Sequence, residues 1–184
     1  EMKVIPHFLV VFLLVLSPLA YGQMIQSFPS MEVTKLNDEA LSLPQDTKGK
    51  YTLIGMSYSK KSEDQLVTWF NPVYQTFIHK PEKPGMFSND YDVNVYFVAM
   101  FAGVNKAAAG PVKKKMRKNS DPELEPHLLF YKGEIKSFKK SLKLDRKDTP
   151  YFFVLDEKGQ IVHTTSGAFS QGKLDAVEEL IEDW

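Results

Sequence analysis

The side chains that could carry chemistry in this chain are histidines and serines, because cysteine is absent. Without a thiol, these 184 residues cannot form a disulfide, a thiolate nucleophile or a cysteine-ligated metal site. The histidines are His7, His79, His127 and His163, and no two stand at ligand spacing. His127 and His163 fall on predicted strands and could meet across a sheet. We favour ordinary hydrogen-bonded histidines over that metal pair and predict no metal or other cofactor.

Three serines, Ser57, Ser59 and Ser62, follow a predicted buried strand. A serine nucleophile needs a nearby base that a third group orients. The sequence has no Gly-x-Ser-x-Gly elbow that would indicate this arrangement. We therefore interpret the three hydroxyls as a helix cap and loop groups.

Charge excludes one class of partner. The chain has 23 Lys and Arg against 23 Asp and Glu, so its net charge of zero provides no long-range field for nucleic acid. The strongest charge run is a basic patch formed by Lys113, Lys114, Lys115, Arg117 and Lys118. It could contact anionic lipid headgroups or an acidic partner, but we favour a solvated helix end, where cations complement the helix dipole.

The first 22 residues have the layout of a secretory signal peptide: a lysine, an apolar run over 8–16, a Ser-Pro break and small residues before Gln23. The apolar run is shorter than the roughly 20 residues that span a bilayer. We therefore expect export to the periplasm or the exterior, with residues 1–22 removed. A retained leader would instead anchor the chain in the membrane.

The elements that would position these groups alternate along the chain. Period-two apolar residues predict a hairpin from 31–36 and 40–43, and a continuous apolar run predicts a buried strand over 51–56. A helix follows, with a Ser62–Gln65 capping box at its start and a bend at Pro72. Trp69 and Phe70 lie on its apolar face and are expected in the core, and Pro81 and Pro84 end it.

Predicted strands and helices also alternate in the second half of the chain. We predict strands over 93–101 and 127–131, a partly helical 103–119 that Gly110–Pro111 interrupts, and a weak helix or turn over 135–144. The chain closes with a hairpin and a helix. The hairpin joins 151–155 to 161–165, and the helix stripe consists of Leu174, Val177, Leu180, Ile181 and Trp184. Strands separated by helices require parallel pairing, so we predict an α/β fold with a mixed central sheet flanked by helices and an N-terminal hairpin.

This order resembles the thioredoxin-like fold, in particular its peroxiredoxin and TlpA-type branch. The local motifs that carry the resemblance are Phe28-Pro29 before the hairpin, Gly49-Lys50 before the first core strand, Thr149-Pro150 before the strand ending in Asp156, and Gly159 in its turn. The resemblance covers about residues 28 to 184. The domains expected are the signal peptide 1–22, an extension with the hairpin at 23–48, and the thioredoxin-like domain at 49–184.

Within that group the chain is most similar to the ATP10 family of mitochondrial ATP synthase assembly factors. The shared residues are Gly49-Lys50-Tyr-Thr-Leu, Ser57, Trp69, Pro72, His127, Phe130-Tyr131, Gly133, Leu142, Tyr151-Phe-Phe-Val-Leu-Asp156 and Gly167. The family implies assembly of a membrane complex without thiol chemistry. The secretory leader differs from a mitochondrial presequence, so we expect export.

The resemblance also implies a site. Thioredoxin-like enzymes carry their redox cysteines where the first core strand meets the long helix, and here that junction reads Ser57-Tyr-Ser-Lys-Lys-Ser62. The matching Thr-Pro bond is cis in thioredoxins, so Pro150 is expected to be cis, with a free carbonyl beside it for an extended peptide. The predicted binding residues are Ser59, Lys60, Lys61, Ser62, Thr149 and Pro150.

We therefore predict a non-redox, exported assembly or chaperone-like factor that binds a protein client near a membrane. The client would belong to a membrane complex under assembly, and peripheral contact with the membrane itself is a further expectation. The alternatives are a metal or small-ligand carrier, an enzyme with a non-thiol mechanism, or a structural domain of a larger envelope complex.

Overall fold

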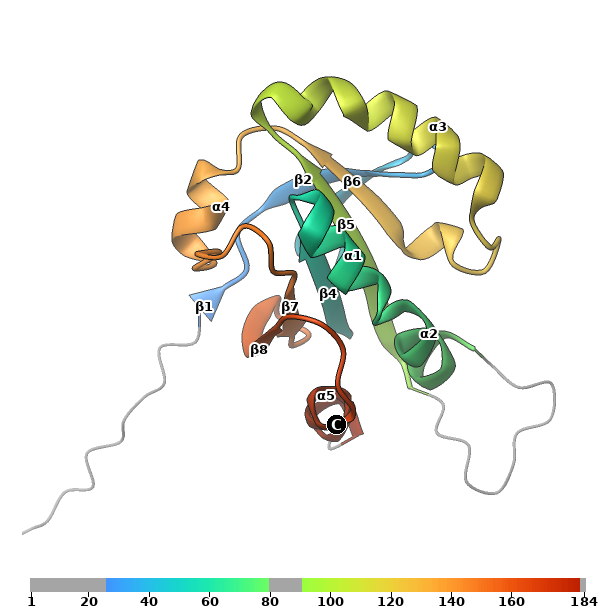
Figure 1. Cartoon of the computed structure of the whole chain (residues 1–184). Coiled ribbons are helices and arrows are strands. Elements are labelled where there is room, and N and C mark those ends of the chain that lie inside the picture. The colour runs from blue at the N-terminus through green and yellow to red at the C-terminus, as the bar shows by residue number, and fades with distance from the viewer. Residues whose placement is uncertain (1–25, 80–90, 183–184) are drawn as a thin grey trace, which may run out of the picture.

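The computed structural model describes residues 26–79 and 91–182 (Figure 1). The expected leader at 1–22 lies outside these residues, as do Pro81, Pro84 and Trp184. Within them, the expected strands are present and form one mixed sheet of eight strands in the order β1-β8-β7-β4-β5-β6-β2-β3. The fold class predicted from the alternation of elements is therefore confirmed.

The strands at the centre of the sheet are parallel, whereas the outer ones are antiparallel. β4, β5 and β6 pair in parallel, and β7 and β2 pair antiparallel on either side of them. The strands are β1 Gln26–Ser27, β2 Met31–Lys35, β3 Ala40–Leu43, β4 Tyr51–Ser57, β5 Val93–Phe101, β6 Leu128–Lys132, β7 Tyr151–Leu155 and β8 Gln160–Ser166.

Both predicted hairpins form. β2 and β3 pair antiparallel with Met31 opposite Leu43, and Asp38 takes a positive φ of 70° in the turn between them. β7 and β8 pair antiparallel through the turn that contains Gly159, whose φ of 79° suits a glycine. These hairpins give the sheet its antiparallel margins.

The sheet is buried on both faces by two layers of apolar side chains. On β7 the residues alternate, since Phe152 and Val154 join one cluster while Phe153 and Leu155 join the other. The first cluster holds side chains of α1, α2 and α5, and the second holds Phe138 of α4. The helices are α1 Lys60–Val67, α2 Phe70–Val73, α3 Ala109–Asn119, α4 Lys136–Ser141 and α5 Gln171–Glu182, with shorter helical turns at Gln45–Thr47, Tyr74–Ile78, Gly103–Ala108 and Glu125–His127.

The helix after β4 differs from its prediction both at its N-terminal cap and at Pro72. Its cap is Ser59, with Ser62 as the third helical residue, so the predicted Ser62–Gln65 capping box is wrong by three positions. The helix also does not bend at Pro72 but ends at Val67 and restarts at Phe70. Pro72 then lies in the first turn of α2, where a missing N–H costs no hydrogen bond.

Gly110–Pro111 does not interrupt the third helix as expected. The chain forms a 3₁₀ segment over Gly103–Ala108 and then α3, which starts at Ala109. Both residues therefore fall in the first turn of α3, where proline is tolerated for the same reason as Pro72. Gly110–Pro111 therefore lies at the start of α3 rather than within a longer helix.

Trp69 is fully buried, as predicted for the core. Its ring stacks on Phe152 with centroids 4.1 Å apart, and its Nε1 donates a 3.0 Å hydrogen bond to the Gly167 carbonyl. Gly55 on β4 allows this close packing, because a Cβ there would stand 2.6 Å from Phe152 and 3.0 Å from Leu66 of α1. The absence of a side chain at this position lets α1 approach the sheet.

Candidate functional site

The serines between β4 and α1 bind the backbone that surrounds them. Ser62 is fully buried, and its Oγ accepts hydrogen bonds from the amides of Tyr58 and Ser59 at 3.2 and 3.0 Å. The Ser59 Oγ in turn accepts the Ser62 amide at 3.2 Å. These contacts cap α1 and occupy both hydroxyls, which agrees with a structural rather than a nucleophilic role.

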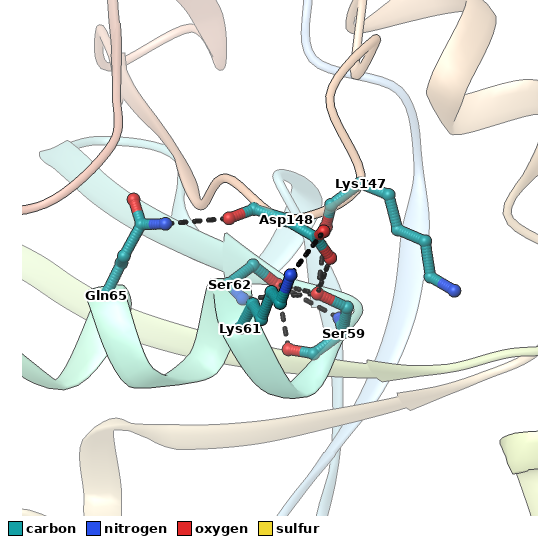
Figure 2. A network of polar contacts seen from close by, with 6 residues as sticks. All are labelled: Ser59, Lys61, Ser62, Gln65, Lys147 and Asp148. Carbon is teal, nitrogen blue, oxygen red and sulfur yellow. Dashed lines mark hydrogen bonds and ion pairs between the residues drawn. The ribbon is translucent and has the colours of Figure 1, made fainter.

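A second segment, far along the chain, closes over this turn. The Ser59 Oγ lies 3.0 Å from the Lys147 carbonyl and 3.1 Å from the Asp148 carboxylate, and Gln65 donates to the Asp148 carbonyl at 2.8 Å. Lys61 forms a longer ion pair with Asp148 at 3.7 Å. We call this network, drawn in Figure 2, the Ser59 junction. It places the 59–62 segment beside the segment that leads to Pro150, the juxtaposition expected from the sequence.

Pro150 itself differs from the expectation. Within the described residues the cis peptide bond is Leu43–Pro44, and the Thr149–Pro150 bond is trans. Pro150 is buried and Thr149 half-buried. The Pro150 carbonyl accepts the Gly167 amide at 2.9 Å, because the β7–β8 ladder continues one bond beyond Tyr151 and Ser166. This carbonyl is therefore not free to pair with an extended peptide.

Open space lies on the other side of Ser59. A cavity of about 210 Å³ is lined by residues of the β4–α1 turn and the end of β5, including Tyr58, Ser59 and Lys60. A second, of about 490 Å³, shares Tyr58 and Asn105 with it and extends to α4 and Lys147. We call the two together the Tyr58 groove. It lies past the carboxyl ends of β4, β5 and β6, where open α/β sheets commonly bind ligands.

Tyr58 lines both cavities. Its hydroxyl donates a 2.9 Å hydrogen bond to the Leu144 carbonyl, and Lys139 stands over its ring, 5.7 Å from the centroid. Burial raises the pKa of Tyr58 to about 12, so the phenol is protonated at neutral pH. Tyr58 therefore lines the groove as a largely buried, uncharged aromatic side chain.

The rim of the groove carries more positive than negative charge. Lys60 pairs with Glu63 and Asp64, and Lys106 pairs with Glu134 at 2.5 Å, a hydrogen bond that lowers the pKa of Glu134. Within residues 26–79 and 91–182, three further lysines on the rim have no ion pair. They are Lys136, Lys139 and Lys147.

The predicted basic patch on α3 divides into two sets. Lys113 is buried, and its Nζ bonds Asp38 at 2.6 Å and the Thr34 hydroxyl at 3.1 Å, while Arg117 also pairs with Asp38. These hydrogen bonds lower the pKa of Asp38 and fasten the β2–β3 turn to α3. The other members of the patch are exposed and have no ion pair within the described part of the chain. They are Lys114, Lys115 and Lys118.

The histidines do not converge. His127 Nδ1 lies 2.8 Å from the Val95 carbonyl just before β6, whereas His163 lies on β8. Because β7, β4 and β5 stand between those strands, the two are separated by about 19 Å at roughly 4.8 Å per strand. The expected approach of the two across the sheet is therefore wrong. In the part of the chain that the structure describes, no three His, Asp or Glu side chains gather as metal ligands.

Sequence reasoning did not find most of the groove. Tyr58, Val104 and the rim lysines of α4 come from separate segments, and no local motif connects them. The available signal was positional, since each segment follows the carboxyl end of a parallel strand.

No helix of the described residues is long and apolar enough to cross a membrane.

Comparison with known proteins relates this chain to a protein family and to several solved structures. A model of the ATP10 protein family matches residues 21–182. Yeast Sco1 is 14% identical with a TM-score of 0.53, the match covering 86% of this chain and 96% of that one. BsSco, of the Sco family, is 12% identical with a TM-score of 0.56 and coverages of 85% and 92%. The mitochondrial 2-Cys peroxiredoxin of Plasmodium falciparum is 14% identical with a TM-score of 0.52 and the same coverages.

The comparison with curated proteins returns no match. At the identities of the solved structures the likeness establishes the fold, which is thioredoxin-like and agrees with the mixed sheet described above. The family model reaches further, because it spans most of the sequence and all of the described residues. The chain belongs to the ATP10 protein family.

Proposed function

We propose that this protein is a non-redox assembly factor that holds a segment of a client polypeptide in the Tyr58 groove without reacting with it. Its membership of the ATP10 family supports a role in assembling a membrane complex. The Sco family, which shares the fold, is described as one of cytochrome c oxidase assembly proteins. Both point toward protein partners rather than a small-molecule substrate.

One observation carries the proposal: the position that supports thiol chemistry in related folds is closed, while a groove opens beside it. The Ser59 and Ser62 hydroxyls are bound to backbone groups, and the 184 residues contain no cysteine. The adjoining groove combines an apolar floor with a charged rim. Such a surface binds through contact area and charge and needs no nucleophile.

The residues predicted for binding take two parts in this proposal. Ser59 and Lys60 line the groove directly. Lys61 and Ser62 hold the Ser59 junction together, and Thr149 and Pro150 continue the segment that closes it. We propose that the Ser59 junction supports one side of the binding site, and that the client contacts the residues of the junction that face the Tyr58 groove.

We also propose that the protein is exported and works beside a membrane. The secretory layout of residues 1–22 supports export. The exposed Lys114, Lys115 and Lys118 would permit peripheral contact with anionic headgroups. Mass spectrometry of the protein from its own cells tests the leader: a chain starting at Gln23 supports export, and a retained leader favours a membrane anchor.

Site-specific photo-crosslinking in living cells tests the binding role. A benzoylphenylalanine at Val104, which is 95% exposed on the groove, should capture a defined client protein. The matched control is the same probe at Val67, an exposed valine on α1 that does not line the groove. Equal adducts from both positions, or none from Val104, would contradict the proposal.

A further inference from the structure

The charges around the Tyr58 groove are unequal although the whole chain is neutral. The acidic groups on its lining, Glu63 and Glu134, are each paired with a lysine. Asp145 and Asp148 also lie near enough to Tyr58 to act on it, and Asp148 pairs with Lys61. Lys136 and Lys139, three positions apart and so on one face of α4, have no carboxylate partner among the described residues. Lys147, from the segment that leads to Pro150, lines the same cavity.

The structure holds Lys147 in place by its backbone and leaves its amine available. Its carbonyl lies 3.0 Å from the Ser59 Oγ in the junction. Figure 2 shows the side chain extending away from that network, with its amine apart from the labelled residues. The Lys139 amine, by contrast, is held over the Tyr58 ring, 5.7 Å from its centroid. Of the three unpaired cations, Lys139 is therefore positioned at its amine, and Lys147 is positioned at its backbone only.

An exposed apolar side chain lines the same cavity as these cations. Val104 is 95% exposed and lines the same cavity, together with the half-buried Ile135. A concave surface with apolar contacts suits a chain segment better than a flat bilayer surface. The second cavity, at about 490 Å³, falls within the roughly 300–1,000 Å³ of ligand pockets.

We propose that the polypeptide segment received by the Tyr58 groove is acidic. Its carboxylates would pair with Lys136, Lys139 and Lys147, and an apolar side chain of the segment would contact Val104. This inference rests on the proposed function and adds the chemistry of the client. A groove that carries an uncompensated positive charge rejects basic segments and recruits acidic ones.

Fluorescence anisotropy with the full chain tests the charge preference. The probe is a short labelled peptide that alternates Glu and Leu, and its control has Gln in place of every Glu. We expect the acidic peptide to bind about tenfold more tightly, with the difference shrinking as salt is added. Equal affinity for the two peptides overturns the inference.

Paired charge reversals test the location. K136E with K147E should weaken binding of the acidic peptide about tenfold. K114E with K118E on α3 is the matched control, because it makes the same change in net charge at exposed lysines that have no ion pair within the described part of the chain. Thermal unfolding of both variants verifies that they fold. Equal losses in the two variants would overturn the inference, since the effect would then follow net charge alone.

Two further outcomes separate this inference from its alternatives. If anionic vesicles bind the chain and K136E with K147E removes that binding while the acidic peptide fails to bind, the groove lysines contact lipid and the inference is wrong. If the peptide preference fails but the Val104 probe still captures a client, the acidic character is wrong and the assembly function stands. Loss of both results removes the two proposals together.

Discussion

The Ser59 junction and the Tyr58 groove meet at Ser59 but differ in what their polar groups bind. In the junction, the hydroxyls of Ser59 and Ser62 and the amide of Gln65 are all bound to other parts of the chain. In the groove, the three rim lysines have no ion pair among the described residues. The difference teaches that polar groups of one region stabilise the fold, whereas those of the other remain available to a partner.

The substitution with the largest expected effect on stability is Ser62→Ala in the Ser59 junction. The substitution leaves the amides of Tyr58 and Ser59 without their acceptor in a buried turn. We expect the free energy of unfolding to fall by about 2–3 kcal/mol, measured by urea denaturation. Ser137→Ala, at an exposed serine of α4, is the control and should change little. A neutral Ser62→Ala would mean that the junction is not structural.

Ser59→Ala should have a smaller effect. The helix cap is lost, together with the contact to the 147–148 segment, so we expect a decrease of about 1 kcal/mol in the free energy of unfolding. Ser59→Asp would retain a capping acceptor but set a second carboxylate against Asp148. Circular dichroism during denaturation measures both. A variant with alanine as stable as the parent would contradict the assignment of Ser59 as the cap.

Tyr58 is adjacent to Ser59, and its substitution by phenylalanine should change how the stability of the protein depends on pH. The folded pKa of Tyr58, about 12, lies above its ordinary value of 10.0, so the folded state retains the proton longer than the unfolded state. This contribution is complete below about pH 10 and is lost as the pH rises toward about 12. At neutral pH the loss of the bond to Leu144 should cost about 1 kcal/mol.

Stability measured across alkaline pH decides this prediction. The parent should lose more stability than Tyr58→Phe as the pH rises above about 10. Parallel curves for the two proteins would show that the phenol does not contribute.

The smallest effect on stability is expected for Val104→Ser in the groove. The side chain is almost fully exposed, so the free energy of unfolding should stay within about 0.5 kcal/mol of the parent. Client capture, measured by co-purification after crosslinking, should still fall several-fold. Unchanged capture would show that the client does not rest on Val104.

The strands were predictable because burial on both faces leaves a local mark. The β-branched and aromatic run over Val93–Phe101 predicts β5 with its observed bounds. The start of α1 was not predictable from the sequence. A serine that could cap a helix stands at both Ser59 and Ser62, each followed three positions later by a polar residue. In the folded chain Gln65 does not cap the helix but bonds the Asp148 carbonyl, 83 positions away. Local patterns carry no information about such contacts.

The site was predictable only in part for the same reason. The fold resemblance correctly brought the 59–62 and 147–150 segments together. It misplaced the free carbonyl at Pro150, because the extra β7–β8 hydrogen bond to Gly167 depends on how far two strands remain paired. The groove lysines lie on segments joined only by the folded sheet, so no spacing in the sequence marks them.

The cap of α1 has a consequence for the order of folding. The Ser59 side chain finds one of its partners 88 positions later, at the Lys147 carbonyl, so the helix start is completed by a segment made much later in the chain. Closing so long a loop is slow compared with local helix formation. In pulsed hydrogen exchange, the amides at the start of α1 should therefore become protected late, together with those of β7.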